Sequence, residues 1–277
     1  MSSAPRVLSL EERKRLKNVR IKKHNLANIL LHWFNVASWF VLLPTGLAIL
    51  ISPHFRVVSL HFNNILRSMF GGLFNLLYFH QTWGLIWIFV ILFNVILGFR
   101  KYFVPFSSRN MMMDRDDIEW FKMKPLQVLG FKAELPPQGA YNAGQKAYSY
   151  VVFLGIITIM ITGLIMTFPE YMPARWIVQW ALPLHFLAVG GVVAGLVVHV
   201  YMGAIFPEEK SAFFSMFTGN VDGLYAYSHH YKFFKQKVAE IEEWEKEEKR
   251  KIAEEMLLQR EREEREKRQE ANKEIES

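Results

Sequence analysis

Two histidines lie inside the most apolar part of this sequence, the stretch 182–206, which contains no Asp, Glu, Lys or Arg. His185 and His199 are fourteen residues apart. In an α-helix this spacing returns both imidazoles to nearly the same face and separates them by about 21 Å along the axis. An imidazole is costly in lipid and usually faces a functional interior, where it can bind a metal or relay a proton. Three glycines between them would leave room for flat cofactors: Gly190, Gly191 and Gly195.

These histidines must be positioned by membrane-spanning helices. Four apolar segments are long enough to cross a hydrocarbon core of roughly 30 Å as helices, and they lie at about 26–52, 75–99, 147–168 and 182–206. His32 lies near the start of the first segment and His80 near the start of the second. We therefore expect an all-α integral membrane protein, built as a bundle of four transmembrane helices.

The distribution of positive charge predicts the orientation of this bundle. Lysine and arginine are concentrated in residues 1–25, in the segment 100–146, which holds eight of them, and after the fourth span. Because cytoplasmic loops of membrane proteins carry an excess of Lys and Arg, both termini are expected in the cytoplasm. The same clustering explains the formal net charge of +7 better than binding to nucleic acid does. The polar N-terminus lacks the apolar region of a cleavable signal peptide, so the first span would direct insertion.

The expected orientation pairs the four histidines by depth. His80 and His185 fall near the outer side, whereas His32 and His199 fall near the cytoplasmic side. Each pair could supply both axial imidazoles of one haem b iron. Such ligation suits electron transfer, because no coordination position remains open.

Other interpretations of the histidines stay open at this point. Any single membrane histidine could be hydrogen-bonded between helices, and zinc is disfavoured because neither depth offers a cysteine or a nearby carboxylate. The chain has no cysteine, which excludes disulfides, thiolate-bound iron–sulfur clusters and haem attached through C-x-x-C-H. Glycine one turn after a ligand, as at Gly84 and Gly203, leaves room for a porphyrin against the backbone. The remaining histidines are expected in solvated or headgroup positions: His24, His54, His61, His229 and His230.

A polar motif, Y-N-A-G-Q-K at 141–146, stands immediately before the third span. Its purely structural interpretation is an ordinary helix start, in which Asn142 caps the helix and Lys146 faces lipid phosphates. The functional interpretation rests on location, because the motif lies at the depth of His32 and His199. There the amide side chains and a closely approaching glycine backbone could hydrogen-bond a quinone carbonyl.

The motifs taken together resemble the cytochrome b (gamma) subunit of respiratory formate dehydrogenase. They are H-W at 32–33, H-x-x-x-G at 80–84, Y-N-A-G-Q-K at 141–146, L-x-x-H-x(13)-H-x-Y-M at 182–202, and M-F-T-G-N-V at 216–221. The resemblance covers roughly residues 25–235. The loop 56–78 and the tail after residue 237 depart from it.

The resemblance implies two b haems, with His32 and His199 binding the cytoplasmic one and His80 and His185 the outer one. It also implies that Asn142, Gly144 and Gln145, with His199, border a pocket for menaquinone or ubiquinone. The implied partners are an iron–sulfur subunit and a molybdenum or tungsten catalytic subunit. The implied location is the bacterial or archaeal cytoplasmic (inner) membrane. Related alternatives are the cytochrome b subunit of a nickel–iron hydrogenase or of another molybdenum or sulfur oxidoreductase. An alternative of another class is a cofactor-free membrane anchor or proton relay.

Composition divides the chain into three parts. Residues 1–25 form a basic cytoplasmic N-terminus, and residues 26–237 hold the four-helix di-haem domain. Residues 238–277 are almost all Glu, Lys, Arg, Gln and Ala. Favourable i,i+4 charge pairs predict a solvated, helical extension there, without the sustained apolar seam of a coiled coil.

Overall fold

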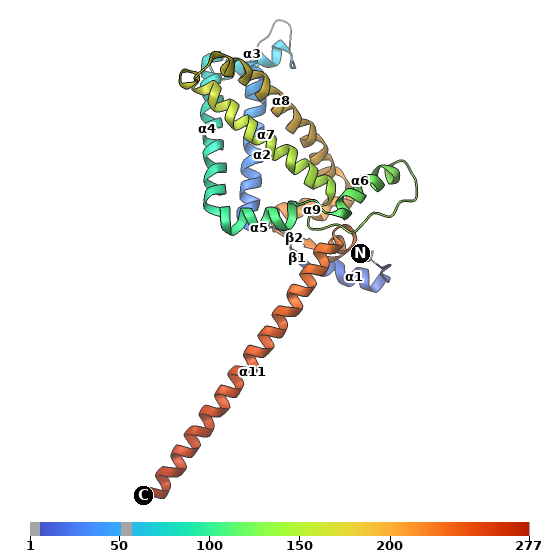
Figure 1. Ribbon diagram of the computed structural model, residues 1–277, viewed down its shortest axis with the longest axis vertical. Helices are drawn as coiled ribbons and strands as arrows, with labels where there is room; N and C mark the ends of the chain where they lie inside the picture. Colours follow the sequence, from blue (N-terminus) through green and yellow to red (C-terminus); the bar gives the residue numbers. More distant parts are fainter. Residues whose placement is uncertain (1–5, 51–56, 277) are drawn as a thin grey trace.

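The computed structural model describes residues 6–50 and 57–276, and it contains four helices long and apolar enough to cross a membrane. They are α2 (Leu26–Ile49), α4 (Leu73–Gly98), α7 (Ala143–Thr167) and α8 (Arg175–Val200). In Figure 1 they form one bundle. Large apolar side chains on these helices are exposed, among them Phe40, Phe74 and Leu187. This is the surface expected of helices that meet lipid. The prediction of a helical membrane protein with four spans is confirmed.

The ends of the spans differ from the prediction because helices continue past the apolar runs. Helix α4 passes into π-helical turns, η1 (Phe99–Phe103) and η2 (Ser107–Met111), on either side of α5 (Val104–Phe106). This extension turns across the lower end of the bundle (Figure 1). Helix α8 begins seven residues before the expected start and ends in the π-helical turn η4 (Tyr201–Ile205). The expected end of the first span, at 51–52, lies outside the described residues.

The spans pack mainly as two pairs, α7 along α8 and α2 along α4. A buried apolar cluster on α4, α7 and α8 joins the pairs, and its members are Trp87, Ile159, Met160 and Val192. The Trp87 indole Nε1 donates a 2.9 Å hydrogen bond to Asn35 Oδ1 on α2. The buried indole is therefore satisfied, and α2 is tied to the same core.

The connecting segments contain further helices that hydrophobicity alone does not reveal. Opposite the termini, α3 (Leu60–Met69) follows Ser59, whose side chain caps it, and η3 (Pro169–Tyr171) links α7 to α8. At the other end, α6 (Arg115–Val128) is followed by an extended segment that returns to α7. His54 lies outside the described residues.

Residues 6–25 and 207–237 form a terminal cap at one end of the bundle. The cap contains α1 (Leu10–Asn18), η5 (Pro207–Glu209), α9 (Lys210–Thr218) and α10 (Gly223–His229). Two short strands, β1 (Arg20–Lys22) and β2 (Asn220–Asp222), pair antiparallel with Ile21 opposite Val221, and both of these side chains are buried. Gly219 adopts φ +78° against the His24 carbonyl, a conformation that favours glycine. Both ends of the bundle sequence therefore lie on the same side (Figure 1). Its assignment to the cytoplasm stays a prediction.

The prediction of a solvated position is wrong for His230, which is buried inside the terminal cap. Its Nδ1 lies 2.7 Å from the Gly139 carbonyl oxygen, and its Nε2 lies 3.3 Å from the Tyr225 hydroxyl. Burial, with Lys23 nearby, holds the pKa of His230 well below its usual value. His24 is partly buried beside the same lysine, and its pKa is lowered to about 4, mainly by desolvation. The polar neighbours of His230 in the sequence suggested exposure to solvent. The loop before α7, which contains Gly139, covers this histidine in the folded protein.

These two histidines predict that the terminal cap loses stability in mild acid. Below the ordinary histidine pKa of 6.5, His24 and His230 become protonated in the unfolded chain but stay neutral in the folded cap. The free energy of unfolding should therefore fall between pH 6.5 and 5 by about 1 to 3 kcal/mol. Lys23, with its pKa lowered by burial to about 8, stays protonated over this range in both states. Thermal unfolding at pH 7.5 and 5.0 measures the effect, and His230→Gln should reduce it. An unchanged pH dependence in that variant would contradict the assignment to His230.

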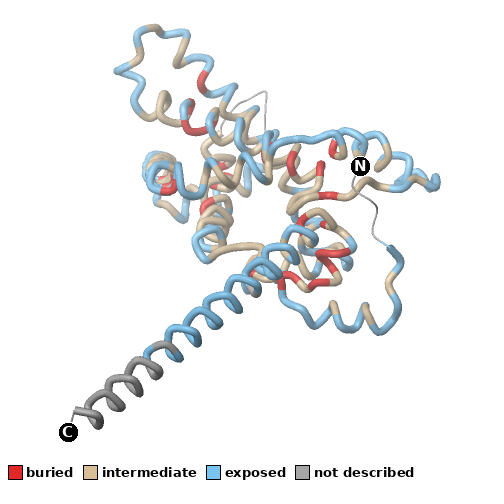
Figure 2. Tube along the Cα trace, turned by 60° about the horizontal axis from the view of Figure 1, so that its bottom comes forward, coloured by how far each residue is buried: buried red, intermediate tan, exposed pale blue. Residues whose placement is uncertain are grey.

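The charged tail is one helix, α11 (Tyr231–Glu276), which projects away from the bundle in Figure 1. It crosses the expected boundary at 237–238 without a break, so the tail continues a helix rooted in the terminal cap. Phe233 is buried in the cap core, whereas the described side chains after residue 237 are exposed (Figure 2). Glu247 and Lys251 form an i,i+4 ion pair of 3.3 Å, one of those that the sequence suggests.

Candidate functional site

His32 on α2 and His199 on α8 face one another near the end of the bundle that carries the terminal cap. Their ring centres are 6.5 Å apart, with 63° between the ring planes. Two imidazoles on opposite sides of one metal place their ring centres about 6 to 6.5 Å apart, because metal–nitrogen bonds are about 2 Å long. The Tyr148 ring of α7 stacks on His199 at 5.7 Å and 28°. The spacing of this pair therefore fits a shared metal.

His80 on α4 and His185 on α8 are the second pair that the sequence predicts. Each ring contacts a buried threonine on the neighbouring helix. His80 Nδ1 lies 2.9 Å from Thr45 Oγ1 on α2, and His185 Nδ1 lies 2.9 Å from Thr162 Oγ1 on α7. Glycine follows each threonine in the sequence, at Gly46 and Gly163, so each pair presents a small surface to the neighbouring helix. The role of the threonines as hydrogen-bond partners emerges from the packing.

The glycines near the histidines divide into two kinds. A Cβ atom at Gly84 or Gly203, one turn after His80 and His199, would meet no other atom within 4 Å, and the same holds for Gly190 and Gly191. Gly195 is different, because a Cβ there would come within 2.2 Å of the Tyr148 ring. The missing side chain at Gly195 therefore makes room for the Tyr148 ring between α7 and α8. That Gly195 leaves room for a cofactor stays a prediction.

A buried donor without a partner lies beside the second pair. Trp83, one position before Gly84 on α4, has a buried indole Nε1 with no hydrogen-bond partner among the described residues. A buried N–H of this kind usually has an acceptor, and a haem carboxylate would supply one. Paired imidazoles, glycine backbones near both pairs and this free donor all fit a haem at each level.

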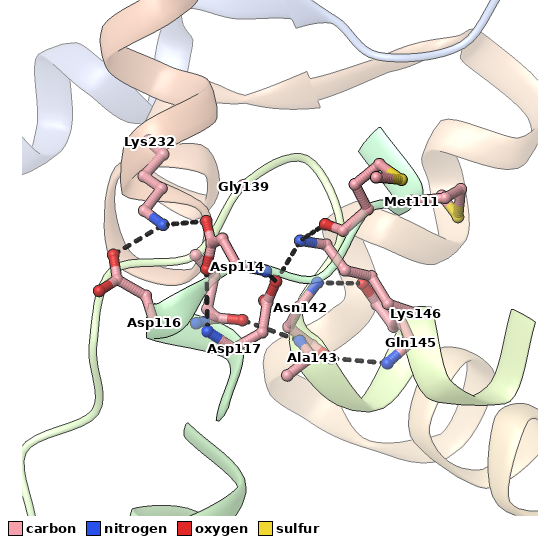
Figure 3. Close-up of polar contacts among 12 residues, drawn as sticks. Met111, Asp114, Asp116, Asp117, Gly139, Asn142, Ala143, Gln145, Lys146 and Lys232 are labelled. Atoms are coloured by element: carbon pink, nitrogen blue, oxygen red, sulfur yellow. Dashed lines mark hydrogen bonds and ion pairs between the residues drawn. The ribbon is translucent and has the colours of Figure 1, made fainter. Parts of the chain in front are cut away.

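The Y-N-A-G-Q-K motif forms the start of α7, as its purely structural interpretation expects. Asn142 Oδ1 accepts from Gln145 N at 2.9 Å, and Gln145 Oε1 accepts from Asn142 N at 3.0 Å. This reciprocal capping box, seen in Figure 3, uses both side-chain oxygens and leaves both amide NH₂ groups outside the box. Gly144 packs against Trp120 of α6, whose Cη2 lies 3.2 Å from the position of an added Cβ. Both amide groups therefore still have donors to offer a ligand.

Lys146 does not face lipid phosphates, contrary to what the helix-start interpretation suggested. Lys146 is buried, and its Nζ lies 2.6 Å from Asp117 Oδ2 and 3.1 Å from the Met112 carbonyl oxygen. Asp117 belongs to α6, which the long polar segment folds over the start of α7 (Figure 3). Lys232 of α11 binds two other aspartates at the start of α6. Its Nζ lies 2.6 Å from Asp114 Oδ2 and 2.7 Å from Asp116 Oδ2. Sequence spacing contains no signal for these partners, which are 29 or more residues away.

The terminal cap brings a further cation next to the motif. Lys23 Nζ lies 5.3 Å from the ring centre of Tyr141, the first residue of the motif, and 5.9 Å from that of Tyr225. Burial raises the pKa of Tyr141 to about 12 and lowers that of Lys23 to about 8. A half-buried amine with such a pKa can hold or release a proton near neutral pH. In the sequence, Lys23 is marked only as one of the Lys and Arg residues concentrated in 1–25.

Comparison with known proteins matches this architecture to a family. The family model described as prokaryotic cytochrome b561 matches residues 23–219. The formate dehydrogenase cytochrome b556 subunit of Haemophilus influenzae is 24% identical over 226 residues, covering 80% of this chain and 85% of that protein. The cytochrome b556(fdo) subunit of Escherichia coli K12 formate dehydrogenase is 27% identical over 127 residues. Its nitrate-inducible b556(Fdn) counterpart is 28% identical over 138 residues.

The extent of these matches differs. The two Escherichia coli proteins are matched over 58% and 61% of their length, whereas the family model extends from Lys23 to Gly219 and so includes all four spans. All four histidines and the Y-N-A-G-Q-K motif lie within that range. The chain belongs to the prokaryotic cytochrome b561 family and is a multi-pass protein of the bacterial inner membrane.

Proposed function

We propose that this chain is the membrane subunit of a formate dehydrogenase-type respiratory complex. It passes electrons from an iron–sulfur subunit through two b haems to a membrane quinone. The observation that carries the proposal is the presence of two histidine pairs whose shared helix, α8, contributes His185 and His199. Fourteen residues of helix separate these two by about 21 Å, so the pairs lie one behind the other across the membrane.

Each of the two histidine pairs would bind one haem. His80 and His185 would hold the outer haem, and His32 and His199 would hold the cytoplasmic one. Haem supplies one-electron redox chemistry when bound. Two imidazoles on each iron leave no open coordination position, so each site favours electron transfer over substrate binding. The iron–sulfur partner and a molybdenum or tungsten catalytic subunit meet the outer face of the bundle.

The start of α7 is the proposed quinone pocket. Asn142 and Gln145 would donate from their free amide groups to a quinone carbonyl, with the Gly144 backbone and His199 beside it. Reduction of a quinone takes up protons as well as electrons, and Lys23 near Tyr141 can deliver one. Uptake from the cytoplasm, with electrons entering from outside, makes the reaction charge-separating.

A reduced-minus-oxidised spectrum of the purified protein, with haem quantified as its pyridine complex, tests this proposal. We expect two b haems per chain. No haem in well-folded protein would overturn the electron-transfer function and favour a membrane anchor or proton relay. Subunits that copurify decide the donor, since a nickel–iron hydrogenase or another molybdenum or sulfur oxidoreductase would contradict the formate dehydrogenase assignment.

Asn142→Asp tests the quinone pocket without removing the helix cap. Aspartate keeps the oxygen that accepts from Gln145 N but replaces the amide donor, and one lost hydrogen bond of about 1.4 kcal/mol raises the KM for quinone about tenfold. Quinone reduction by the isolated complex is the measurement, at unchanged haem content. Asn25→Asp is the matched control, because Asn25 caps α2 in the same way through Asn28 N. Equal effects of the two substitutions would contradict a specific role for Asn142.

A further inference from the structure

The two histidines of the outer pair are held by the same arrangement, built twice from different helices. Thr45 on α2 contacts His80 on α4, and Thr162 on α7 contacts His185 on α8, each at 2.9 Å from Nδ1. Both threonines are 4% exposed. The glycine after each threonine lies against the same imidazole, because an added Cβ would be 3.1 Å from His80 Cε1 at Gly46 and 3.7 Å from His185 Cε1 at Gly163.

The direction of these hydrogen bonds follows from the other contacts of the hydroxyl groups. Thr45 Oγ1 lies 2.7 Å from the Val41 carbonyl oxygen, and Thr162 Oγ1 lies 2.6 Å from the Thr158 carbonyl oxygen. A carbonyl oxygen can only accept, and a hydroxyl has a single proton to donate. That proton is therefore committed to the helix backbone, so each threonine oxygen accepts from the imidazole. The proton of each neutral imidazole then sits on Nδ1, and the Nε2 lone pair is free for a metal.

The inner pair lacks this arrangement. Within the described part of the chain, no hydroxyl group hydrogen-bonds to either ring of His32 or His199. Their contacts are instead aromatic, with Trp33 against His32 at 5.5 Å between ring centres and Tyr148 stacked on His199. The two levels of the bundle therefore offer different surroundings to otherwise identical ligands.

We propose that Thr45 and Thr162 are positioning residues that fix the tautomer of His80 and His185 and lower the reduction potential of the outer haem. An imidazole that donates from Nδ1 is a more basic ligand, and a more basic ligand favours the ferric over the ferrous state. Since the inner pair has no such bonds, the outer haem becomes the weaker oxidant of the two. Electrons then move downhill from the outer to the inner level, the direction that quinone reduction requires. This inference rests on the proposed function.

The test is a redox titration of the purified complex, followed optically, for Thr45→Val and Thr162→Val. Valine keeps the shape of threonine and removes only the hydroxyl. We expect each substitution to shift the reduction equilibrium of one haem about two- to tenfold toward the reduced form. Tenfold corresponds to a rise of about 59 mV for one electron. The potential of the other haem should stay unchanged, and the double variant should show roughly the sum of the two shifts.

Matched substitutions separate the hydroxyl effect from packing. Thr45→Ser and Thr162→Ser keep the acceptor and should restore the wild-type potential. Thr158→Val is the control on α7, because its hydroxyl contacts only the Leu154 carbonyl oxygen among the described residues, and it should leave both potentials unchanged. If a valine variant loses haem, the serine variant at that position must regain both the haem and the wild-type potential.

Two results would overturn the inference. One is unchanged potentials in both valine variants while two haems stay bound, and the other is serine variants that behave like valine. Both leave the proposed function intact, because haem content is measured in the same samples. Absence of haem from the wild-type protein would instead overturn the proposed function itself.

Discussion

Replacing His199 with alanine is expected to halve the haem content of the purified protein, from two b haems per chain to one. Removal of one imidazole leaves His32 as the single protein ligand at a level where the two ring centres are 6.5 Å apart. A haem with one axial ligand is held less tightly and gains an open position. Haem quantified against protein, together with the reduced spectrum, measures the loss. Electron transfer to quinone should fall to background in the same preparation.

Double substitutions extend this result to the pairing of the histidines. His32→Ala with His199→Ala removes two ligands from one level, so one haem should remain. His80→Ala with His199→Ala removes one ligand from each level, so none should remain. His61→Ala serves as the control, since this histidine is exposed on α3, and it should retain both haems. Two haems in the first double variant, or one in the second, would contradict the pairing.

Replacing Asp117 with asparagine is expected to destabilise the end of the bundle that carries the terminal cap by about 3 to 5 kcal/mol. Asp117 and Lys146 form a 2.6 Å ion pair whose side chains are 2% and 7% exposed. Asparagine keeps an oxygen for the Asp114 backbone N–H, so the capping box of α6 persists. It leaves the Lys146 ammonium buried without a counter-charge, and that desolvated charge is the source of the loss. Thermal unfolding in detergent should show a melting temperature lowered by about 6 to 20 °C.

Two variants test the reason for this effect. Asp116→Asn removes a carboxylate from the ion pair with Lys232, which is 27% exposed. Because exposed pairs contribute little, its effect should stay below about 1 kcal/mol. Asp117→Asn combined with Lys146→Met removes both buried charges and should recover much of the lost stability. Equal melting temperatures for Asp116→Asn and Asp117→Asn would rule out the buried pair as the main determinant.

The four spans were predictable because membrane insertion imposes a local rule. A helix that satisfies its own backbone and presents apolar side chains to lipid leaves a continuous apolar run, and the runs around His32, His80, His185 and His199 are of this kind. The ends of the helices were less predictable. Helix α7 starts at Ala143, four residues before the expected 147, because the capping box of Asn142 and Gln145 extends the helix past its apolar part.

Two polar residues were misplaced because their partners lie far along the chain. One interpretation of the motif placed Lys146 against lipid phosphates, and His230 was predicted to face solvent. Both are buried instead, by Asp117 and Gly139, which lie 29 and 91 residues away. Nothing in the local pattern marks either partner. A lysine before a span looks the same whether a later helix covers it or not.

The sequence by itself determined the membrane class, the four spans and the candidate ligands, including the fourteen-residue spacing of His185 and His199. These features depend on composition and helical period, which are local. Only the tertiary structure decided that Thr45 and Thr162 contact His80 and His185 and that Tyr148 stacks on His199. Such contacts depend on how neighbouring helices rotate and slide against each other. Side-chain packing across the whole bundle determines these rotations, because contact with lipid is about equally favourable for every apolar face of a helix.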